Sequence, residues 1–393
     1  MSGHDRTKGA RAVTGALLHR GDGWYVRSAD PADNVALCEL LRQVPMEGAV
    51  DVVQERDPDF FRFAAMHLGI SETFVACLDG TGQIVGCGTY AVRDAYFRRD
   101  DRRRVAYVFD IRVHPEHRGG RIFPELARTG LEHARAHHGV ELAYTAVMDG
   151  NRRSSQAASS RSSKRTVQPI SRPMTRYHMA SILFTGPQEA PHRTVARGTD
   201  SDLDELAQFL GRRQLGRTLG YILDRSLLEA RLQSWPGFTP ASFHLIRDDR
   251  GRIVACAAPW ETSGFRRLRV VRHRGWMRAY RSVYNLQARL RRGVPLPGAG
   301  ACFRYACLSH LEVEDDDPGL CADLLRSVYR DLEPQRLHFI SVMVPRGSRL
   351  QQALRGFFVN RVPMTLYTTS LVGSRWNEID LASSHPGFEM ALA

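Results

Sequence analysis

Lysine is almost absent from this chain of 393 residues, in which only Lys8 and Lys164 occur. A mechanism that forms a Schiff base on lysine is therefore disfavoured. The formal net charge is nevertheless +13, so arginine carries nearly all of the positive charge. Arginine binds phosphate well, and the excess fits an anionic partner such as a phosphate-bearing coenzyme, nucleic acid or acidic lipid. A genome rich in arginine codons explains it equally well.

The sequence also lacks the signals of a membrane or secreted protein. No stretch is apolar enough to span a bilayer, and the basic N-terminus has no apolar core of the kind found in signal peptides. Seven cysteines are dispersed, odd in number and not spaced as metal ligands. We expect buried free thiols and a cytoplasmic protein.

One stretch, 103–139, combines a strand, a glycine turn and a helix. Residues 105–113 are rich in β-branched and aromatic side chains, which predicts a buried strand. Arg118-Gly119-Gly120-Arg121 predicts a turn, and Pro124 is tolerated in the first turn of the helix that follows. Free N–H groups at the helix start, together with Arg118 and Arg121, predict a site for a phosphate or pyrophosphate.

The glycine spacing fits neither a P-loop nor a dinucleotide fingerprint. Residues 113–119, VHPEHRG, instead resemble the V-x-P-x-x-R-G phrase of the GNAT acyltransferases. Arg121 and Phe123 stand where that family usually has small residues. Together with the internal repeat described below, the resemblance implies an α/β fold with two tandem GNAT-like domains, each a mixed, mostly antiparallel sheet flanked by helices. It also implies acetyl-coenzyme A or another acyl-coenzyme A as cosubstrate. The residues it assigns to the coenzyme are Ile111, Arg112, Val113, Arg118, Gly119, Gly120, Arg121, Ile122 and Asn151.

Acyl transfer to an amine requires a polarised carbonyl, a deprotonated amine and a proton for the leaving thiolate. The resemblance implies that backbone N–H groups of residues 110–113 point at the thioester carbonyl. Phe109 stands where some relatives have a glutamate, so Asp110 is a candidate for the base or for orienting the strand. Glu55 is a second candidate acid. The tyrosine that serves many relatives as general acid is missing from residues 152–165.

Much of the first half recurs in the second. Pairs such as Val26 and Val195, or Cys87 and Cys256, are 169 residues apart, whereas Val113 and Val313 are 200 apart. The difference predicts a duplicated domain with an insertion at 261–300. The second copy reads EDDDPGL where the first reads HPEHRGGR, and we expect these carboxylates to cap a helix instead of binding a pyrophosphate.

These patterns predict the following organisation. The expected segments are a flexible leader (1–22), an acyl-coenzyme-A-binding domain (23–184), a linker (185–192), a degenerate copy (193–373) and a tail (374–393).

Two further features have simple structural interpretations. His133 and His137 have the spacing of metal ligands, but without an evident third ligand we expect a surface pair and no metal site. In the insertion, Trp276, Tyr280, Val283 and Tyr284 form an apolar helix face among arginines. We expect this helix to dock on the second domain; a substrate lid, an RNA contact and a membrane-surface contact are the alternatives.

The reading with most support is an acyl-coenzyme-A-dependent N-acyltransferase, in particular an acetyltransferase. Its expected acceptor is the amine of a small molecule or an aminoacyl group. Two rivals remain at this point. One is an aminoacyl-tRNA-dependent transferase of tandem GNAT-like fold, for which tRNA would be the partner. The other is a non-catalytic acyl-coenzyme-A-binding protein.

Overall fold

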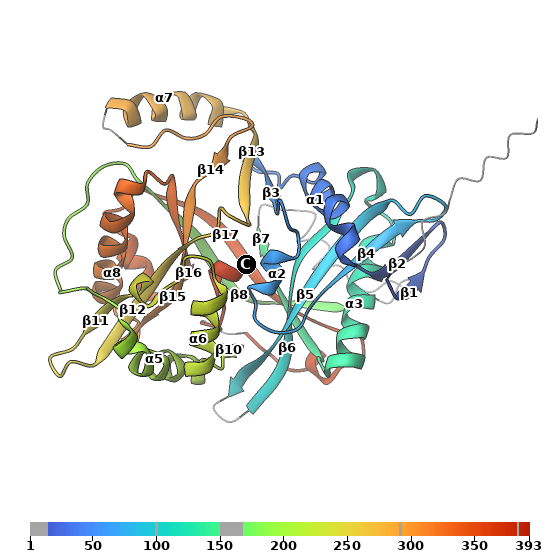
Figure 1. The fold of residues 1–393 in the computed structure, drawn as a ribbon, viewed down its shortest axis with the longest axis horizontal. Helices are drawn as coiled ribbons and strands as arrows, with labels where there is room; N and C mark the ends of the chain where they lie inside the picture. Colours follow the sequence, from blue (N-terminus) through green and yellow to red (C-terminus); the bar gives the residue numbers. More distant parts are fainter. Residues whose placement is uncertain (1–14, 99–100, 150–167, 291–292, 383–384) are drawn as a thin grey trace, which may run out of the picture.

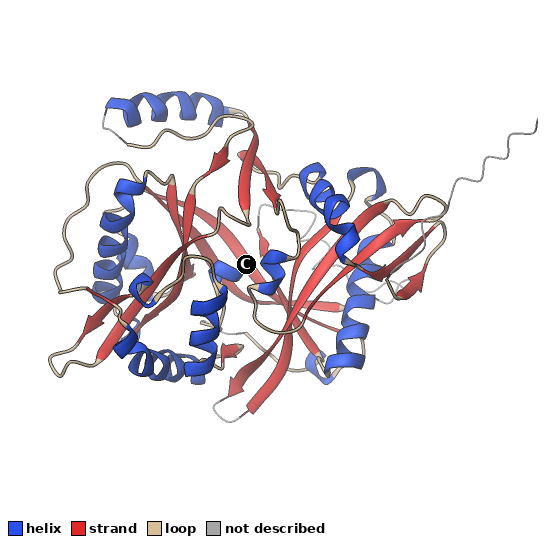
Figure 2. Cartoon of the chain, in the orientation of Figure 1, coloured by secondary structure: helices blue, strands red, loops and turns tan. Residues whose placement is uncertain are grey.

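A long, mostly antiparallel sheet runs through the protein in the computed structural model (Figures 1 and 2). The structure describes residues 15–98, 101–149, 168–290, 293–382 and 385–393. In sheet order its strands are β1 (Leu17–Arg20), β2 (Trp24–Ser28), β4 (Ser71–Leu78), β5 (Ile84–Arg98), β6 (Asp101–Val113), β7 (Leu142–Met148), β17 (Val359–Ser370), β8 (Ile170–Leu183), β16 (Phe339–Pro345), β15 (Tyr305–Val313), β12 (Ile253–Glu261), β11 (His244–Arg247) and β9 (Ala196–Arg197). β10 (Gly220–Tyr221) pairs with β5.

The first copy packs a helix on each face of its part of the sheet. Successive side chains of a strand point to opposite faces, so in β4 Val75 faces α1 (Asn34–Gln43) whereas Phe74 and Ala76 face α3 (Ile122–His138). α3 ends at Gly139, whose φ of 66° is readily adopted only without a Cβ.

The second copy repeats this arrangement, as the sequence predicted. α5 (Leu203–Leu215) packs on the face of the sheet that carries Leu245, and α8 (Pro318–Leu332) packs on the face that carries Ile246. A short 3-10 turn leads into α1 and another into α5, and each starts with a capping box, between Asp30 and Asp33 before α1 and between Thr199 and Asp202 before α5. Residues that are 169 positions apart in the sequence therefore have the same capping role in the two copies.

The two copies exchange their last strands. β17, from the second copy, lies between β7 and β8 and pairs antiparallel with both. β8, at the end of the segment expected to be the first domain, pairs with β16 of the second copy. Each half of the sheet is therefore completed by a strand from the other half, which joins the copies into one continuous sheet (Figure 1).

The insertion forms an arm at the upper left of Figure 1. β13 (Arg267–His273) pairs with β14 (Cys302–Phe303) and with β3 (Val50–Glu55) of the first copy, and α7 (Trp276–Leu290) follows β13. Between the copies lie two further helices, α2 (Arg62–Ala65) and α6 (Arg225–Ser234). The arm thus links the second copy to the segment that contains Glu55.

Both chain ends take part in the packing. β1 lies within the segment expected to be a leader, and it pairs with β2. In the segment expected to be a tail, Ala391 and Leu392 are buried in the core between the copies. All seven cysteines are free thiols, and six of them are buried. None of the described helices is long and apolar enough to cross a bilayer.

Candidate active site

The loop between β6 and α3 is open around its glycines. Gly119 has a φ of 82°, and a Cβ added at Gly119 or Gly120 would meet no atom within 4 Å. Arg118 donates from Nε to the carbonyl of Val113 at 3.0 Å, which holds its side chain beside the loop. Arg121 is the N-cap residue of α3, and no side chain caps this helix. The first N–H groups of α3 therefore lie beside an open loop that carries two arginines, of which Arg121 is paired with Glu125 of the first helical turn at 3.1 Å.

The corresponding helix start in the second copy is filled by a carboxylate. Asp317 accepts hydrogen bonds from the N–H groups of Gly319 at 2.7 Å and Leu320 at 2.8 Å. Asp316 is held by Arg213 at 2.8 Å. The prediction that these acidic residues cap a helix is confirmed for Asp317. α8 has no uncapped donors left at these two positions for a bound anion.

Asp110 lies at a break in β6. Its φ is 50°, the register between β5 and β6 shifts at Cys87 and Thr89, and Cys87 donates its S–H to the carbonyl of Asp110 at 3.3 Å. The parallel pairing of β6 with β7 ends at Tyr107 and Tyr144. Ile111, Arg112 and Val113 therefore continue along a strand edge that no longer pairs with β7, between the bulge and the glycine loop.

His310 occupies the same place in β15. Its φ is also 50°, and the S–H of Cys256 donates to its carbonyl at 3.3 Å. Here the N–H of the bulge residue donates to Glu389 Oε2 at 3.1 Å. A cavity of about 50 Å³ remains beside these residues, lined in part by Arg231, His310 and Glu389. The second copy thus keeps the bulge but directs its N–H to a carboxylate of its own chain.

Asp110 forms a buried ion pair with Arg56. The Arg56 Nη2 atom lies 3.0 and 3.1 Å from the two carboxylate oxygens, and both side chains are almost completely buried. The Arg56 guanidinium lies 4.2 Å from the ring centre of Phe63. Burial lowers the pKa of Arg56, while Asp110 opposes that shift. Asp110 is therefore engaged by an arginine that the sequence had not singled out.

Glu55 points to a different pair of arginines. Its Oε2 lies 3.0 Å from Arg269 Nη2 and 3.4 Å from Arg267 Nε, both on β13. Burial by itself would raise the pKa of Glu55, but the hydrogen bond and charge of Arg269 and the charge of Arg267 outweigh it, and the pKa is lowered. Such a carboxylate is a weak base, and its contacts join β3 to β13.

His67 and Arg266 are two further polar residues between the copies, and the sequence did not identify either of them as a site residue. The His67 ring stacks on Phe109 with 4.7 Å between ring centres, and its Nε2 is shielded from solvent without a hydrogen-bond partner among the described residues. Burial and several arginines lower the pKa of His67 to about 3. Arg266 Nη2 donates to Cys307 Sγ at 3.2 Å. A neutral imidazole therefore lies against the strand that carries Asp110.

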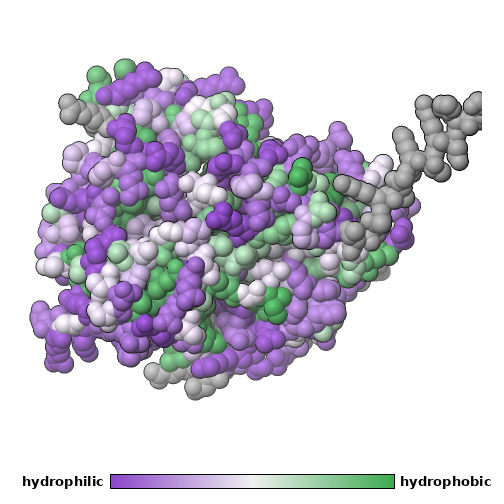
Figure 3. Space-filling view, viewed as in Figure 1, coloured by the Kyte–Doolittle hydropathy of each residue, from purple (hydrophilic) through white to green (hydrophobic). Residues whose placement is uncertain are grey.

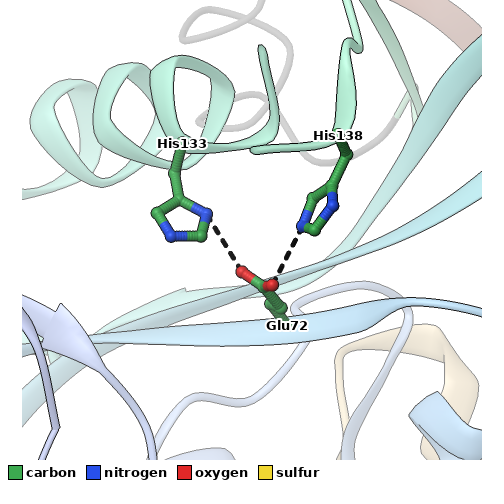
Figure 4. Close-up of side chains that lie close together, drawn as sticks. All are labelled: Glu72, His133 and His138. Atoms are coloured by element: carbon green, nitrogen blue, oxygen red, sulfur yellow. Dashed lines mark hydrogen bonds and ion pairs between the residues drawn. The ribbon is translucent and has the colours of Figure 1, made fainter. Parts of the chain in front are cut away.

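A cluster of Glu72, His133 and His138 could in principle hold a metal ion (Figure 4). His133 Nδ1 lies 3.0 Å and His138 Nε2 lies 2.9 Å from the two oxygens of Glu72, and Tyr90 donates to Glu72 at 2.8 Å. The expected pair of His133 and His137 is present as neighbouring rings, 4.2 Å between centres. Because each ligand atom has a partner within the cluster, hydrogen bonding accounts for this geometry. Asn151, the remaining candidate of the sequence, lies outside the described residues.

Comparison with known proteins agrees with this geometry. Residues 36–158 match the family model "Acetyltransferase (GNAT) family". No curated protein sequence matches significantly. Among solved structures, Saccharomyces cerevisiae N-myristoyltransferase with bound myristoyl-CoA is similar, with a TM-score of 0.60, 11% identity and coverage of 90% of this chain and 84% of that one. A GCN5-related N-acetyltransferase from Sphaerobacter thermophilus gives a TM-score of 0.55 and 16% identity, covering 94% and 99% of the two chains.

These structural likenesses concern the fold, because the identities are low. The family match lies within the first copy and includes the glycine loop and the bulge at Asp110. Residues 36–158 therefore match the GNAT acetyltransferase family, and the fold of the whole chain is similar to that of N-myristoyltransferase and of a GCN5-related N-acetyltransferase.

Proposed function

We propose that the first copy binds acetyl-coenzyme A and that the chain transfers the acetyl group to the amine of a small molecule or an aminoacyl group. The observation that carries the proposal is the contrast between two helix starts. α3 is uncapped beside Arg118 and Arg121, whereas Asp317 caps α8. A pyrophosphate would be attracted by the first and repelled by the second. The free buried thiols suit a reducing compartment, so we place the reaction in the cytoplasm.

The bulge supplies the polarising group of the mechanism. His310 directs its N–H to a carboxylate oxygen, and Asp110 has the same φ and the same cysteine contact. By this equivalence, the N–H of Asp110 points into the corresponding space of the first copy. There it would donate to the thioester carbonyl oxygen and stabilise the negative charge that develops on it.

The amine nitrogen attacks the thioester carbon, the C–S bond breaks, the amine loses one proton and the coenzyme thiolate gains one. Asp110 is hydrogen-bonded to Arg56, so we assign it mainly to positioning the bulge. Glu55 is held by Arg269, and we assign it to positioning β3. Water or another side chain then supplies the proton for the thiolate.

The identity of the acyl group needs its own experiment. Acetyl is favoured by the description of the matching family model, whereas a solved structure of similar fold contains myristoyl-CoA. Thermal shift with coenzyme A, acetyl-coenzyme A and myristoyl-coenzyme A separates these cases. We expect acetyl-coenzyme A to be turned over faster than the myristoyl thioester with any amine that the enzyme accepts.

Gly120→Glu tests the coenzyme site directly. The site of the added Cβ is open, so the fold should tolerate the change, while the new carboxylate would repel a pyrophosphate. We expect coenzyme binding to weaken by about tenfold or more, with an unchanged unfolding temperature. Gly216→Glu, which is equally open, is the matched control. Equal loss in both variants would refute the proposed site, and binding without turnover of any amine would favour a non-catalytic binding protein.

A further inference from the structure

The helix of the arm, α7, has a second apolar face that is exposed in the described structure and whose Trp276 ring contacts only Tyr280 of the same helix among the described aromatic rings. Eleven large hydrophobic side chains are exposed in the described residues, and four of them lie on this helix. They are Trp276, Val283, Leu286 and Leu290, with exposed fractions of 69, 58, 60 and 78%. At about 100° per residue, these positions and Ala279 fall within a sector of roughly 80°. The exposed residues thus form one stripe along the helix.

This outer stripe is separate from the face that holds α7 in place. Tyr284 and Ala288 are buried against Leu183 and Leu296, with Met277 and Tyr280 packed beside them. Asn285 exchanges hydrogen bonds with the backbone of Leu296, at 2.7 and 3.2 Å. The prediction of a docked helix is therefore confirmed, although Trp276 and Val283, expected on the docked face, lie in the adjoining exposed sector of the helix. Docking leaves the outer stripe unexplained.

The charges around the stripe are of one sign. The sequence contains no aspartate or glutamate between Glu261 and Glu312. On α7, Arg278 donates to the carbonyl of His273, and neither Arg278 nor Arg289 forms an ion pair with a described carboxylate; both are exposed. In the space-filling view, hydrophilic and apolar side chains lie next to each other over α7 (Figure 3). The surface is therefore apolar along its centre and cationic at its edge.

We propose that the outer face of α7 binds the surface of an anionic lipid bilayer. An amphipathic helix with leucine, valine and tryptophan on one face and arginine beside it can lie in the interface, with its apolar side among the acyl chains and its arginines at anionic headgroups. Tryptophan is favoured at this boundary. Val283, Leu286 and Leu290 also weigh against RNA, because aliphatic side chains cannot stack on bases as aromatic ones do.

The arm places this face at the periphery of the molecule. α7 projects beyond the sheet at the top of Figure 1, whereas the glycine loop at the start of α3 lies in the other half. β13 connects the arm to β3 and so to the segment of Glu55 and Arg56. A bilayer bound to α7 would hold the enzyme at a membrane surface without covering the coenzyme loop.

Vesicle sedimentation with the full chain tests the proposal. The wild type should bind vesicles of phosphatidylcholine with 30% phosphatidylglycerol, bind weakly to phosphatidylcholine alone, and lose affinity as salt is raised. The triple variant Val283→Gln/Leu286→Gln/Leu290→Gln should bind at least about tenfold more weakly, with the thermal unfolding of the wild type because all three side chains are exposed. Val35→Gln, on α1 and 77% exposed, should bind like the wild type.

Tryptophan fluorescence gives an independent readout. Trp276 is the most exposed of the five tryptophans, so its emission should shift to shorter wavelength when anionic vesicles are added, and Trp276→Phe should abolish the shift. Arg278→Gln/Arg289→Gln should weaken binding to anionic vesicles and leave the weak binding to neutral ones unchanged. Wild-type binding that survives the triple variant would overturn the proposal. So would the absence of vesicle binding at low salt, or salt-sensitive RNA binding in its place.

Discussion

Asp110 and His310 stand at equivalent bulges of the two copies, but only the N–H of His310 donates to a described side chain, that of Glu389. The helix starts differ in the same sense, because Asp317 caps α8 and no side chain caps α3. In the second copy, carboxylates of the chain itself therefore accept hydrogen bonds from the bulge N–H and from the first N–H groups of the helix. This difference supports our proposal that the first copy, and not the second, accepts an acyl-coenzyme A.

The ion pair of Arg56 with Asp110 should determine both stability and turnover. Asp110→Asn and Arg56→Met each leave a buried group without its partner, and we expect each to lower the free energy of unfolding by roughly 3–5 kcal/mol. The double variant should lose less than the two single variants together, which urea unfolding would measure. If the single variants unfold like the wild type, the pair does not hold the bulge.

Kinetics separate positioning by Asp110 from proton abstraction by it. A positioning role predicts that Arg56→Met and Asp110→Asn lower kcat similarly, because both disturb the same bulge. Proton abstraction predicts instead that Asp110→Asn abolishes turnover and removes the acid limb of the pH–rate profile, while Arg56→Met retains activity. Full activity in both Asp110→Asn and Glu55→Gln, with every accepted amine, would exclude both residues from the mechanism.

Glu55→Gln should be less stable than the wild type mainly at pH values at which the Glu55 carboxyl is ionised. Because the pKa of Glu55 is lowered in the folded chain, its contribution is fully present above its usual pKa of about 4.5 and is lost as the pH falls through the lower folded value. The variant should therefore be less stable than the wild type at pH 7, and the difference should shrink below pH ~4.5. Thermal unfolding between pH 3 and 7 measures this, and a constant difference would contradict the assigned ion pairs.

Local sequence patterns predicted the fold of each copy, but they could not predict contacts between segments that are distant in the sequence. The strand ending at Val113, the glycine turn and α3 depend on neighbouring residues, so their order could be inferred from sequence. Arg56 and Asp110 are 54 residues apart, and no periodicity connects them. Glu389 reaches His310 only because the last segment folds back between the copies. The exchange of β8 and β17 likewise depends on tertiary pairing.

α7 illustrates a second limit of periodicity. Its apolar residues occupy two adjoining sectors of the helix, and the sequence could not tell which one faces the protein. The structure buries Tyr284 and leaves Val283 exposed, because Leu183 and Leu296 contact only one sector. The existence of the helix was predictable, but the direction of its faces was not.

Asp317→Ala should destabilise the second copy without affecting the coenzyme. Loss of an N-cap carboxylate costs about 1 kcal/mol, which corresponds to a fall of roughly 2–4 °C in Tm for a domain of 150–250 residues. Acetyl-coenzyme A binding should remain as in the wild type, as calorimetry would measure. New or stronger binding in the variant would instead mean that the capping carboxylate had been excluding a ligand from α8.

The buried histidines should make the fold sensitive to acid, and His244 offers the clearest test. It is completely buried, and its Nδ1 lies 2.9 Å from Ser327 Oγ. Burial and the charge of Arg197 lower its pKa from 6.5 to about 3, although Asp331 lies 3.6 Å from its Nε2. Since the unfolded chain binds this proton more readily, the stabilisation is complete above pH 6.5 and is lost as the pH falls toward 3.

Between pH 6.5 and 3, the unfolding free energy of the wild type should fall as the pH is lowered. In His244→Gln this fall should be less steep by about 1.4 kcal/mol per pH unit. Glutamine retains a side chain able to hydrogen-bond Ser327, so the variant should still fold. His137→Gln removes an exposed histidine and serves as the control. Urea unfolding at pH 4, 5 and 6 measures the slope. His137→Gln should keep the wild-type dependence of unfolding free energy on pH. If His244→Gln keeps it as well, His244 is protonated in the folded chain as readily as in the unfolded chain, and its burial against Arg197 does not exclude the charged form.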